Sequence, residues 1–257
     1  DTLGDPYAAQ TQFSGMVAPI GESRREANAI KRGEPITVVI GNPPYKDKAK
    51  GLGGWIESGT VGRPSPLSLW HPPANWGVGQ HVHNMKNLYV YFWRWATWKV
   101  FGSGYSETTG ETESERAGII CFITATGFLG GDGFQKMRSE LRRDCSAIWV
   151  IDCSPEGHQA EVATRFFPGV QHPVCIVLAL RVPGGSSETP ASVRYFCLPD
   201  GPRHEKFKAL DALTLHSSDW RDVPDGWRDP FQASLKGSWS NFCALTEVFS
   251  WSSPGVG

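Results

Sequence analysis

The sequence predicts an α/β fold with a mostly parallel sheet, and three observations support this prediction. Short apolar runs, rich in β-branched residues, alternate along the chain with longer segments of helical periodicity. The runs are apolar at nearly every position, which is typical of strands buried on both faces. The segments between them are long enough for the right-handed crossovers that join parallel strands.

The first predicted elements lie before residue 84. A helix is expected from Glu22 to Arg32, ended by Gly33 and Pro35, and a buried strand follows at Ile36–Ile40. Residues 46–83 hold several glycines, prolines and tryptophans and are too long for an ordinary connection. Connections of that length are usually functional or mobile loops.

Helical spacing returns at residues 84–101, where aromatic residues fall on more than one face. Asn84 is the expected N-cap of this helix. An acidic, Ser/Thr-rich segment, residues 103–115, follows and is expected to be a solvated surface insertion. The next apolar run, Gly118–Thr124, predicts a second buried strand.

The following helix is expected to use Asp132 as its cap, to bury its apolar residues and to expose its basic ones. The buried set is Phe134, Met137, Leu141 and Cys145, and the exposed set is Lys136, Arg138, Arg142 and Arg143. Strands at Ile148–Ile151 and Pro173–Leu180 complete the pattern. No helical pattern separates these two strands, so they are expected to be antiparallel.

From about residue 200 the periodicity fades, which indicates the start of a separate module. Four tryptophans lie there among turn residues: Trp220, Trp227, Trp239 and Trp251. The predicted organisation is therefore a core at residues 1–200, followed by a second region at residues 201–257. The chain starts without Met and stops on a turn-like sequence, so we expect a fragment cut at both ends.

Composition excludes several classes of protein. The 25 Lys and Arg balance 26 Asp and Glu, and 12% of residues are aromatic, which argues against a disordered or coiled-coil chain. A net charge of −1 gives no long-range attraction to nucleic acid, so any such role requires a local site. No run of 18 apolar residues predicts a membrane span. The six cysteines form no C-x-x-C pair and are expected to be buried free thiols in a reducing cytoplasm.

The most informative segment, Asn42-Pro43-Pro44-Tyr45, directly follows the first predicted strand. The carboxyl end of such a strand is where α/β sheets bind ligands. Asn42 offers a carbonyl acceptor, and the two prolines fix the backbone without donating hydrogen bonds. Tyr45 presents a flat aromatic face. An ordinary turn at the end of a strand is the alternative interpretation.

These four residues suit a planar amino group on an aromatic ring. Two acceptors can take both N–H groups of the amine while the tyrosine stacks on the ring. Such hydrogen bonds direct the nitrogen lone pair toward an electrophile, which is catalysis by positioning. If the amine belongs to a base in duplex DNA, that base must be flipped out of the stack.

The motif and the segments after it resemble the amino-group DNA methyltransferases of the N6-adenine type. More narrowly, the sequence is similar to the methyltransferase core of type ISP restriction enzymes and related phage-defence proteins. The matching downstream segments, in order, are residues 87–96, residues 118–129 and residues 166–174. The resemblance covers about residues 1–200 and implies a Rossmann-like class I methyltransferase fold, represented mainly by the second half of its sheet.

The resemblance implies S-adenosyl-L-methionine as cofactor, a flipped adenine in double-stranded DNA as substrate, and restriction–modification as the setting. Nuclease or helicase domains on the same full-length polypeptide are implied partners, and residues 201–257 would begin a target-recognition or linker region. The family's glycine-rich cofactor loop is not found in the 41 residues before Asn42, so we expect the chain to lack that loop; Asp1 is the only residue matched to a cofactor contact.

Other site residues have alternatives that the sequence leaves open. Phe167 is expected to lie near the target base, with Phe166 and Phe128 as competitors. Lys46 and Lys48 would meet DNA phosphates or lie in a solvated loop. No metal is expected at His81 and His83, since no third ligand is near in sequence. Other possible functions are methylation of a protein glutamine amide or an RNA base amine, or a catalytically incomplete DNA-binding fragment.

Overall fold

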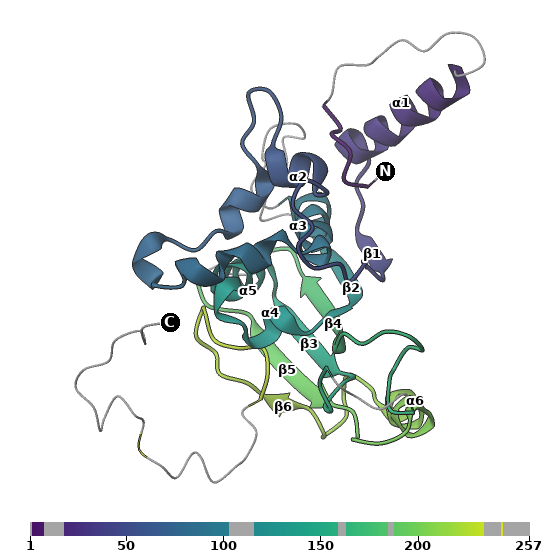
Figure 1. Cartoon of the computed structure of the whole chain (residues 1–257), viewed down its shortest axis with the longest axis vertical. Coiled ribbons are helices and arrows are strands. Elements are labelled where there is room, and N and C mark those ends of the chain that lie inside the picture. Colours follow the sequence, from purple (N-terminus) through teal and green to yellow (C-terminus); the bar gives the residue numbers. More distant parts are fainter. Residues whose placement is uncertain are drawn as a thin grey trace.

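The computed structural model describes residues 2–7, 18–102, 116–158, 163–184, 188–233 and 243. Asp1, the acidic segment at residues 103–115, Trp239 and Trp251 lie outside these ranges. The centre of the fold is a six-stranded sheet in the order β1-β2-β4-β3-β5-β6 (Figure 1). Its strands are β1 Val38–Gly41, β2 Gly118–Ala125, β3 Ala147–Asp152, β4 Val174–Arg181, β5 Ser192–Cys197 and β6 Arg221–Asp222.

The sheet is mixed, with one direction dominant. β1 pairs with β2 in parallel, and β3 pairs with β5 in parallel, whereas β4 lies between β2 and β3 and is antiparallel to both. β1, β2, β3 and β5 therefore run the same way, as the alternation of elements predicts. The antiparallel relation predicted for the strands at 148–151 and 173–180 is confirmed.

The predicted burial of β1 on both faces is wrong. In the described part of the chain β1 is an edge strand, and the side chains of Val38 and Ile40 are 51% and 78% exposed. Within β1 only Val39, which points to the other face, packs on the core, and Ile36 before the strand packs there too. An apolar β-branched run indicates a strand, but it does not tell which neighbours cover that strand.

The helices largely follow the predicted periodicity, with shifted starts. α1 spans Ala18–Gly33, and α3 spans Leu88–Phe101 with Asn87, not Asn84, at its N-cap. Asn84 belongs instead to a 3-10 segment, η4 Gly79–Lys86. α3 is buried on most sides, as the aromatic residues on more than one of its faces predict. It ends at Gly102, whose φ of 71° is the left-handed conformation that glycine adopts most easily.

The long connection before α3 is built from short packed elements. These are α2 Gly54–Ser58, η2 Pro66–Trp70, η3 Ala74–Trp76 and then η4. Trp55 and Trp70 are fully buried within it. This connection therefore contributes side chains to the core. Its high content of glycine and proline is typical of loops, so the sequence does not indicate this packing.

The region between β2 and β3 holds α4 Gly127–Gly130, η6 Asp132–Phe134 and α5 Gln135–Asp144. The four apolar residues predicted to point inward are buried. Asp132 does not cap a helix, because it is the first residue of η6 and makes no capping hydrogen bond.

The predicted exposed basic face of this helix is wrong at two positions. Arg138 and Arg142 are buried, at 2% and 0% exposure. Arg138 donates to the carbonyls of Phe128, Gly131 and Arg228, and Arg142 donates to those of Ala191 and Pro224. These two side chains bind loop carbonyls, and their charge does not face solvent.

Two hydrophobic cores form on the sheet. The larger one lies under α3 and α5 and includes Phe231. The smaller one, named here the carboxyl-end core, consists of Cys153, Phe166, Val174 and Leu198, with residues of α6 Arg203–Ala212 packed on it. α6, β6 and Phe231 therefore pack on the same body as the strands, and the predicted boundary at residue 200 stays a prediction.

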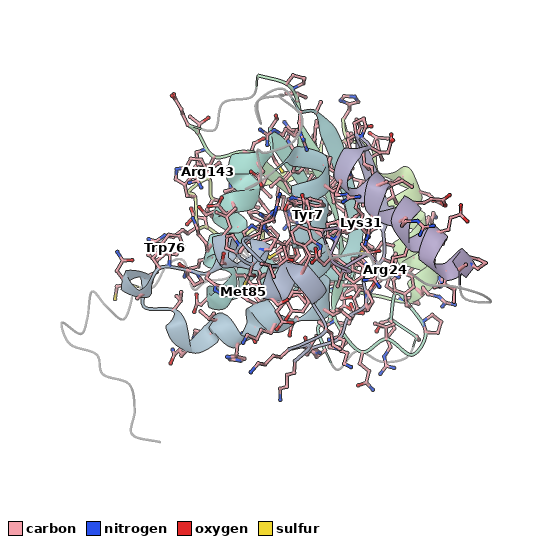
Figure 2. All side chains as sticks on the ribbon, turned by 90° about the horizontal axis from the view of Figure 1, so that it is seen from above. Tyr7, Arg24, Lys31, Trp76, Met85 and Arg143 are labelled. Carbon is pink, nitrogen blue, oxygen red and sulfur yellow. The ribbon has the colours of Figure 1, made fainter. Side chains whose placement is uncertain are left out.

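The outer elements are tied to this body by buried or half-buried cations. Lys99 Nζ of α3 donates to the carbonyls of Ile30, Lys31 and Glu34 at the end of α1, at 2.9, 2.8 and 2.6 Å. Lys31 donates in turn to the carbonyl of Gly4. Figure 2 shows where α1 lies in the molecule: its residues Arg24 and Lys31 are on one side of the view, and Trp76 of η3 and Arg143 of α5 are on the other.

The cysteines are free, as predicted, but not all are buried. Cys145, Cys153 and Cys175 are buried, Cys121 and Cys197 are half-buried, and Cys243 is exposed. Burial raises the pKa of Cys153 and Cys175 above the ordinary thiol value, so both remain protonated at neutral pH.

Candidate functional site

The Asn42-Pro43-Pro44-Tyr45 motif lies at the carboxyl end of β1. β1 ends three register positions before β2 does, because Gly41 is paired with Phe122 while β2 continues to Ala125. Pro43 is buried, whereas Asn42 and Pro44 are exposed and Tyr45 is half-buried. Pro43 therefore packs inside the protein, while the Asn42 amide and part of the Tyr45 ring remain accessible.

Asn42 and Tyr45 contact each other directly. The Tyr45 hydroxyl donates to Asn42 Oδ1 and lies 3.5 Å from the carbonyl of Ile123 on β2. Burial, followed by the nearby Cys175 and Cys153 thiols, raises the pKa of Tyr45 to about 12. At neutral pH the hydroxyl is thus a donor that orients the amide, while Oδ1 keeps a second lone pair for another hydrogen bond.

Phe167 lies on the same side of the sheet as Tyr45. Both rings are partly buried and pack against the carboxyl-end core. Its two competitors are buried instead: Phe166 is 5% exposed within that core, and Phe128 is fully buried in the larger one. Phe166 meets Phe167 edge to face, with ring centroids 5.0 Å apart. Phe167 is therefore the aromatic of the three that keeps free surface.

The residues after the motif form an exposed, well-anchored loop. Lys46 and Lys48 are exposed, and Lys48 has a φ of 51°. The backbone N–H of Lys48 donates to Asn87 Oδ1 at 3.1 Å, and that of Leu88 donates to the Lys46 carbonyl at 2.8 Å. These bonds hold the loop on the start of α3 and leave both ammonium groups in solvent.

A cavity of about 540 Å³ opens beside this loop, within the size range of ligand pockets. The loop after the motif, residues 46–48, is called here the motif loop. The cavity wall is formed by residues of this loop, of the start of α3, of the turn after β2 and of the segment before β4. Among the lining residues are Asp47, Lys48, Asn87, Thr126, His172 and Gln232. The sequence contains no local signal for this cavity, because its walls come from segments far apart in the chain.

Asp47 and His172 join two of these walls. His172 Nδ1 lies 3.9 Å from Asp47 Oδ2, an ion pair when the imidazole is protonated, and the His158 ring meets the His172 ring at a centroid distance of 5.6 Å. The link connects the motif loop with the β3–β4 connection that carries Phe167. Neither histidine was expected to belong to the site.

The remaining residues that the sequence singles out are Asp1, His81 and His83, and His83 lines the cavity. Asp1 is outside the described residues. His83 Nδ1 lies 2.9 Å from the carbonyl of Gln80, and His81 Nε2 lies 3.1 Å from the Gln80 amide. Among the residues that the structure describes, no three His, Cys, Asp or Glu side chains gather as a metal site would require, and no helix is long and apolar enough to cross a membrane.

Comparison with known proteins gives structural matches only. No protein-family model and no curated protein sequence matches the chain. Three solved structures are similar at 18% identity each: the ATP-dependent type ISP restriction–modification enzyme LlaBIII bound to DNA (TM-score 0.63), the DrdV–DNA complex (0.58), and a nuclease-deletion mutant of the type ISP enzyme LlaGI with a DNA substrate mimic (0.56).

These matches cover most of this chain but little of the other proteins. They span 90%, 93% and 86% of the chain, which corresponds to 14%, 22% and 20% of the LlaBIII, DrdV and LlaGI chains. At 18% identity the likeness concerns the fold. The mixed α/β sheet and its helices therefore have the fold of one part of larger proteins that were solved with DNA or a DNA mimic, two of which are type ISP restriction–modification enzymes.

Proposed function

We propose that this chain is the target-base part of a DNA methyltransferase that modifies adenine N6 within a restriction–modification system. The observation that carries the proposal is the motif itself: Asn42 and Tyr45 are hydrogen-bonded to each other at the carboxyl end of a strand, with the amide and the ring accessible. The fold shared with DNA-bound restriction–modification enzymes supports duplex DNA as the partner.

The proposed chemistry rests on two acceptors and two rings. Asn42 Oδ1, through its free lone pair, and the Pro43 carbonyl accept the two N–H groups of the adenine amine. Tyr45 stacks on the flipped base, and Phe167 packs near it. With both hydrogens held, the nitrogen lone pair points away from the ring plane, toward an incoming electrophile. No general base of shifted pKa is needed for this positioning.

DNA backbone contacts are proposed for the exposed loop after the motif. Lys46 and Lys48 extend into solvent beside the cavity, where phosphates of a bent or opened duplex could approach. The net charge of −1 gives no global attraction, so these local contacts would act together with parts of the complete enzyme beyond this chain.

S-adenosylmethionine is proposed as the methyl donor, although the described residues do not form a complete site for it. The carboxylate that ends β3, Asp152, already accepts from the Ser154 N–H and from the Tyr195 hydroxyl, each at 2.9 Å. The described residues before β1 contain no glycine-rich turn after a strand. The roles proposed for this chain therefore concern the amine and the base.

A substrate assay tests the proposal. The complete product of the reading frame is incubated with S-adenosylmethionine that carries a labelled methyl group and with plasmid DNA free of adenine methylation, total RNA or cellular protein. We expect label in DNA, at adenines in one sequence context that long-read sequencing identifies. Label in RNA or on protein glutamine would contradict the DNA assignment. DNA retention without label in any polymer would indicate a binding module.

Substitutions at Tyr45 separate stacking from hydrogen bonding. Tyr45→Ala should lower kcat/KM for DNA by about tenfold to hundredfold, because stacking of a base on an aromatic side chain contributes about 1–3 kcal/mol. Tyr45→Phe keeps the ring and should lose less than about tenfold, the effect of one hydrogen bond. Steady-state methyl transfer measures both. Equal losses in the two variants would show that the hydroxyl, not the ring, is the contributing group.

A further inference from the structure

α6 carries a charged side chain that is completely enclosed. Lys206 has 0% exposure, and its Nζ donates to the carbonyls of Cys153 and Thr164 at 3.0 and 2.8 Å. It also lies 2.7 Å from both carboxylate oxygens of Glu156. A buried ammonium is stable only when its protons are all bound, and here they are.

The partners of Lys206 lie on both arms of one connection. Cys153 and Glu156 follow β3, whereas Thr164 precedes the Phe166–Phe167 pair. The backbone of α6 adds a further bond, because the Arg203 N–H donates to the Ala163 carbonyl at 2.9 Å. α6 is therefore bonded both to residues directly after β3 and to residues directly before Phe166 and Phe167.

α6 also contacts the aromatic pair itself. The Phe207 ring packs on Phe166 with centroids 5.1 Å apart, and Phe166 meets Phe167 at 5.0 Å. Tyr45 and Phe167 pack against the same core that contains Phe166. A series of ring contacts therefore runs from α6 through Phe166 to Phe167, and Tyr45 packs on the core to which Phe166 belongs.

We infer that α6 is a positioning element for the rings proposed to receive the base, and that Lys206 is its principal positioning residue. Lys206 binds the described arms of the β3–β4 connection and so keeps Phe167 on the core that Tyr45 also contacts, and Phe207 packs on Phe166. This inference rests on the proposed function, since it gives α6 a task in holding a flipped base. It extends the site into the part of the chain beyond residue 200.

The replacement of Lys206 by methionine should relax the connection. The aliphatic stem is retained, but Glu156 and two carbonyls lose their donor in a buried setting. The connection would then move to reach water, and Phe167 would move with it. Misplacement of a positioning group by about 1 Å can reduce a rate by about 100-fold.

The test uses the complete product of the reading frame and a duplex with 2-aminopurine at the adenine that sequencing identifies as methylated. Fluorescence of this base rises when it leaves the stack, so flipping is measured apart from methyl transfer. Lys206→Met should reduce the flipping signal on this duplex, and kcat on the same duplex with adenine at that position, by about tenfold or more, while binding of both duplexes changes little. Arg142→Met is the matched control, because Arg142 is also fully buried and bonded to carbonyls, but its partners Ala191 and Pro224 lie outside this connection.

The outcomes distinguish the inference from the proposed function. If the wild-type protein neither methylates nor flips an adenine, the proposed function is wrong. If the wild type does both and Lys206→Met equals it, or Arg142→Met loses flipping equally, the positioning role of Lys206 is wrong. Phe207→Ala is a second variant that will fold, since Phe207 is 42% exposed, and it should lower the flipping signal by about three- to tenfold. Wild-type flipping in Phe207→Ala would overturn the role of α6.

Discussion

Replacing Asn42 by alanine should reduce adenine methylation by the complete enzyme by about 100- to 1000-fold, which is the effect of losing one preorganised hydrogen-bonding group at a reacting centre. Asn42 Oδ1 is the acceptor that Tyr45 orients, and no other side chain of the motif can replace it. Because Asn42 is exposed, its loss should leave folding and DNA binding intact. Single-turnover methyl transfer gives the rate, and a melting curve gives the stability.

Two further substitutions make the result at Asn42 specific. Asn42→Asp keeps an oxygen acceptor at the same position and should retain measurable methylation. Asn75→Ala removes an equally exposed asparagine from η3, away from the motif, and should have the activity of the wild type. Full methylation by Asn42→Ala would refute the assignment of the motif as the amine-binding group.

The motif could be predicted from the sequence because its geometry is local. A short β-branched run forms a strand, and two prolines restrict the backbone directly after it, so the placement of Asn42 and Tyr45 depends on few neighbours. The second hydrogen-bond contact of Tyr45, with the Ile123 carbonyl, needs the pairing of β1 with β2. The exposure of β1 and the cavity beside it depend on distant segments, and no local pattern contains that information.

The predicted exposure of Arg138 and Arg142 is wrong for a different reason. Charge patterning treats a lysine or arginine on a helix as a solvated group, yet Arg94, Arg138, Arg142 and Lys206 are buried and bind backbone carbonyls. The chain has 19 prolines, each of which keeps a carbonyl acceptor but has no N–H donor. Packed connections rich in proline and glycine therefore contain more acceptors than their own backbone can satisfy. Buried cations supply the missing donors.

Arg138 should show this effect most strongly. Arg138→Met should lower the free energy of unfolding by about 3 kcal/mol, because one buried and two part-buried carbonyls lose a donor and an unsatisfied buried group costs about 1–3 kcal/mol. Those carbonyls belong to Phe128 in α4, to Gly131 directly after α4, and to Arg228 in the segment after β6. Chemical denaturation of the wild type and the variant measures the difference. Since single domains are stable by about 5–15 kcal/mol, a loss of this size should be evident in the transition midpoint.

Arg143 on the same helix is the matched control for this prediction. Its side chain is 45% exposed and forms an ion pair with Glu140 at 2.6 Å, and such partly exposed pairs contribute about 0–1 kcal/mol. Arg143→Met should therefore change the unfolding free energy by less than about 1 kcal/mol, although it removes the same guanidinium from the same helix. Equal destabilisation by the two substitutions would mean that loss of charge on α5, and not loss of the carbonyl bonds, sets the stability. A large difference would show that a buried arginine stabilises this fold as a hydrogen-bond donor to its loops, a role that charge patterning alone does not reveal.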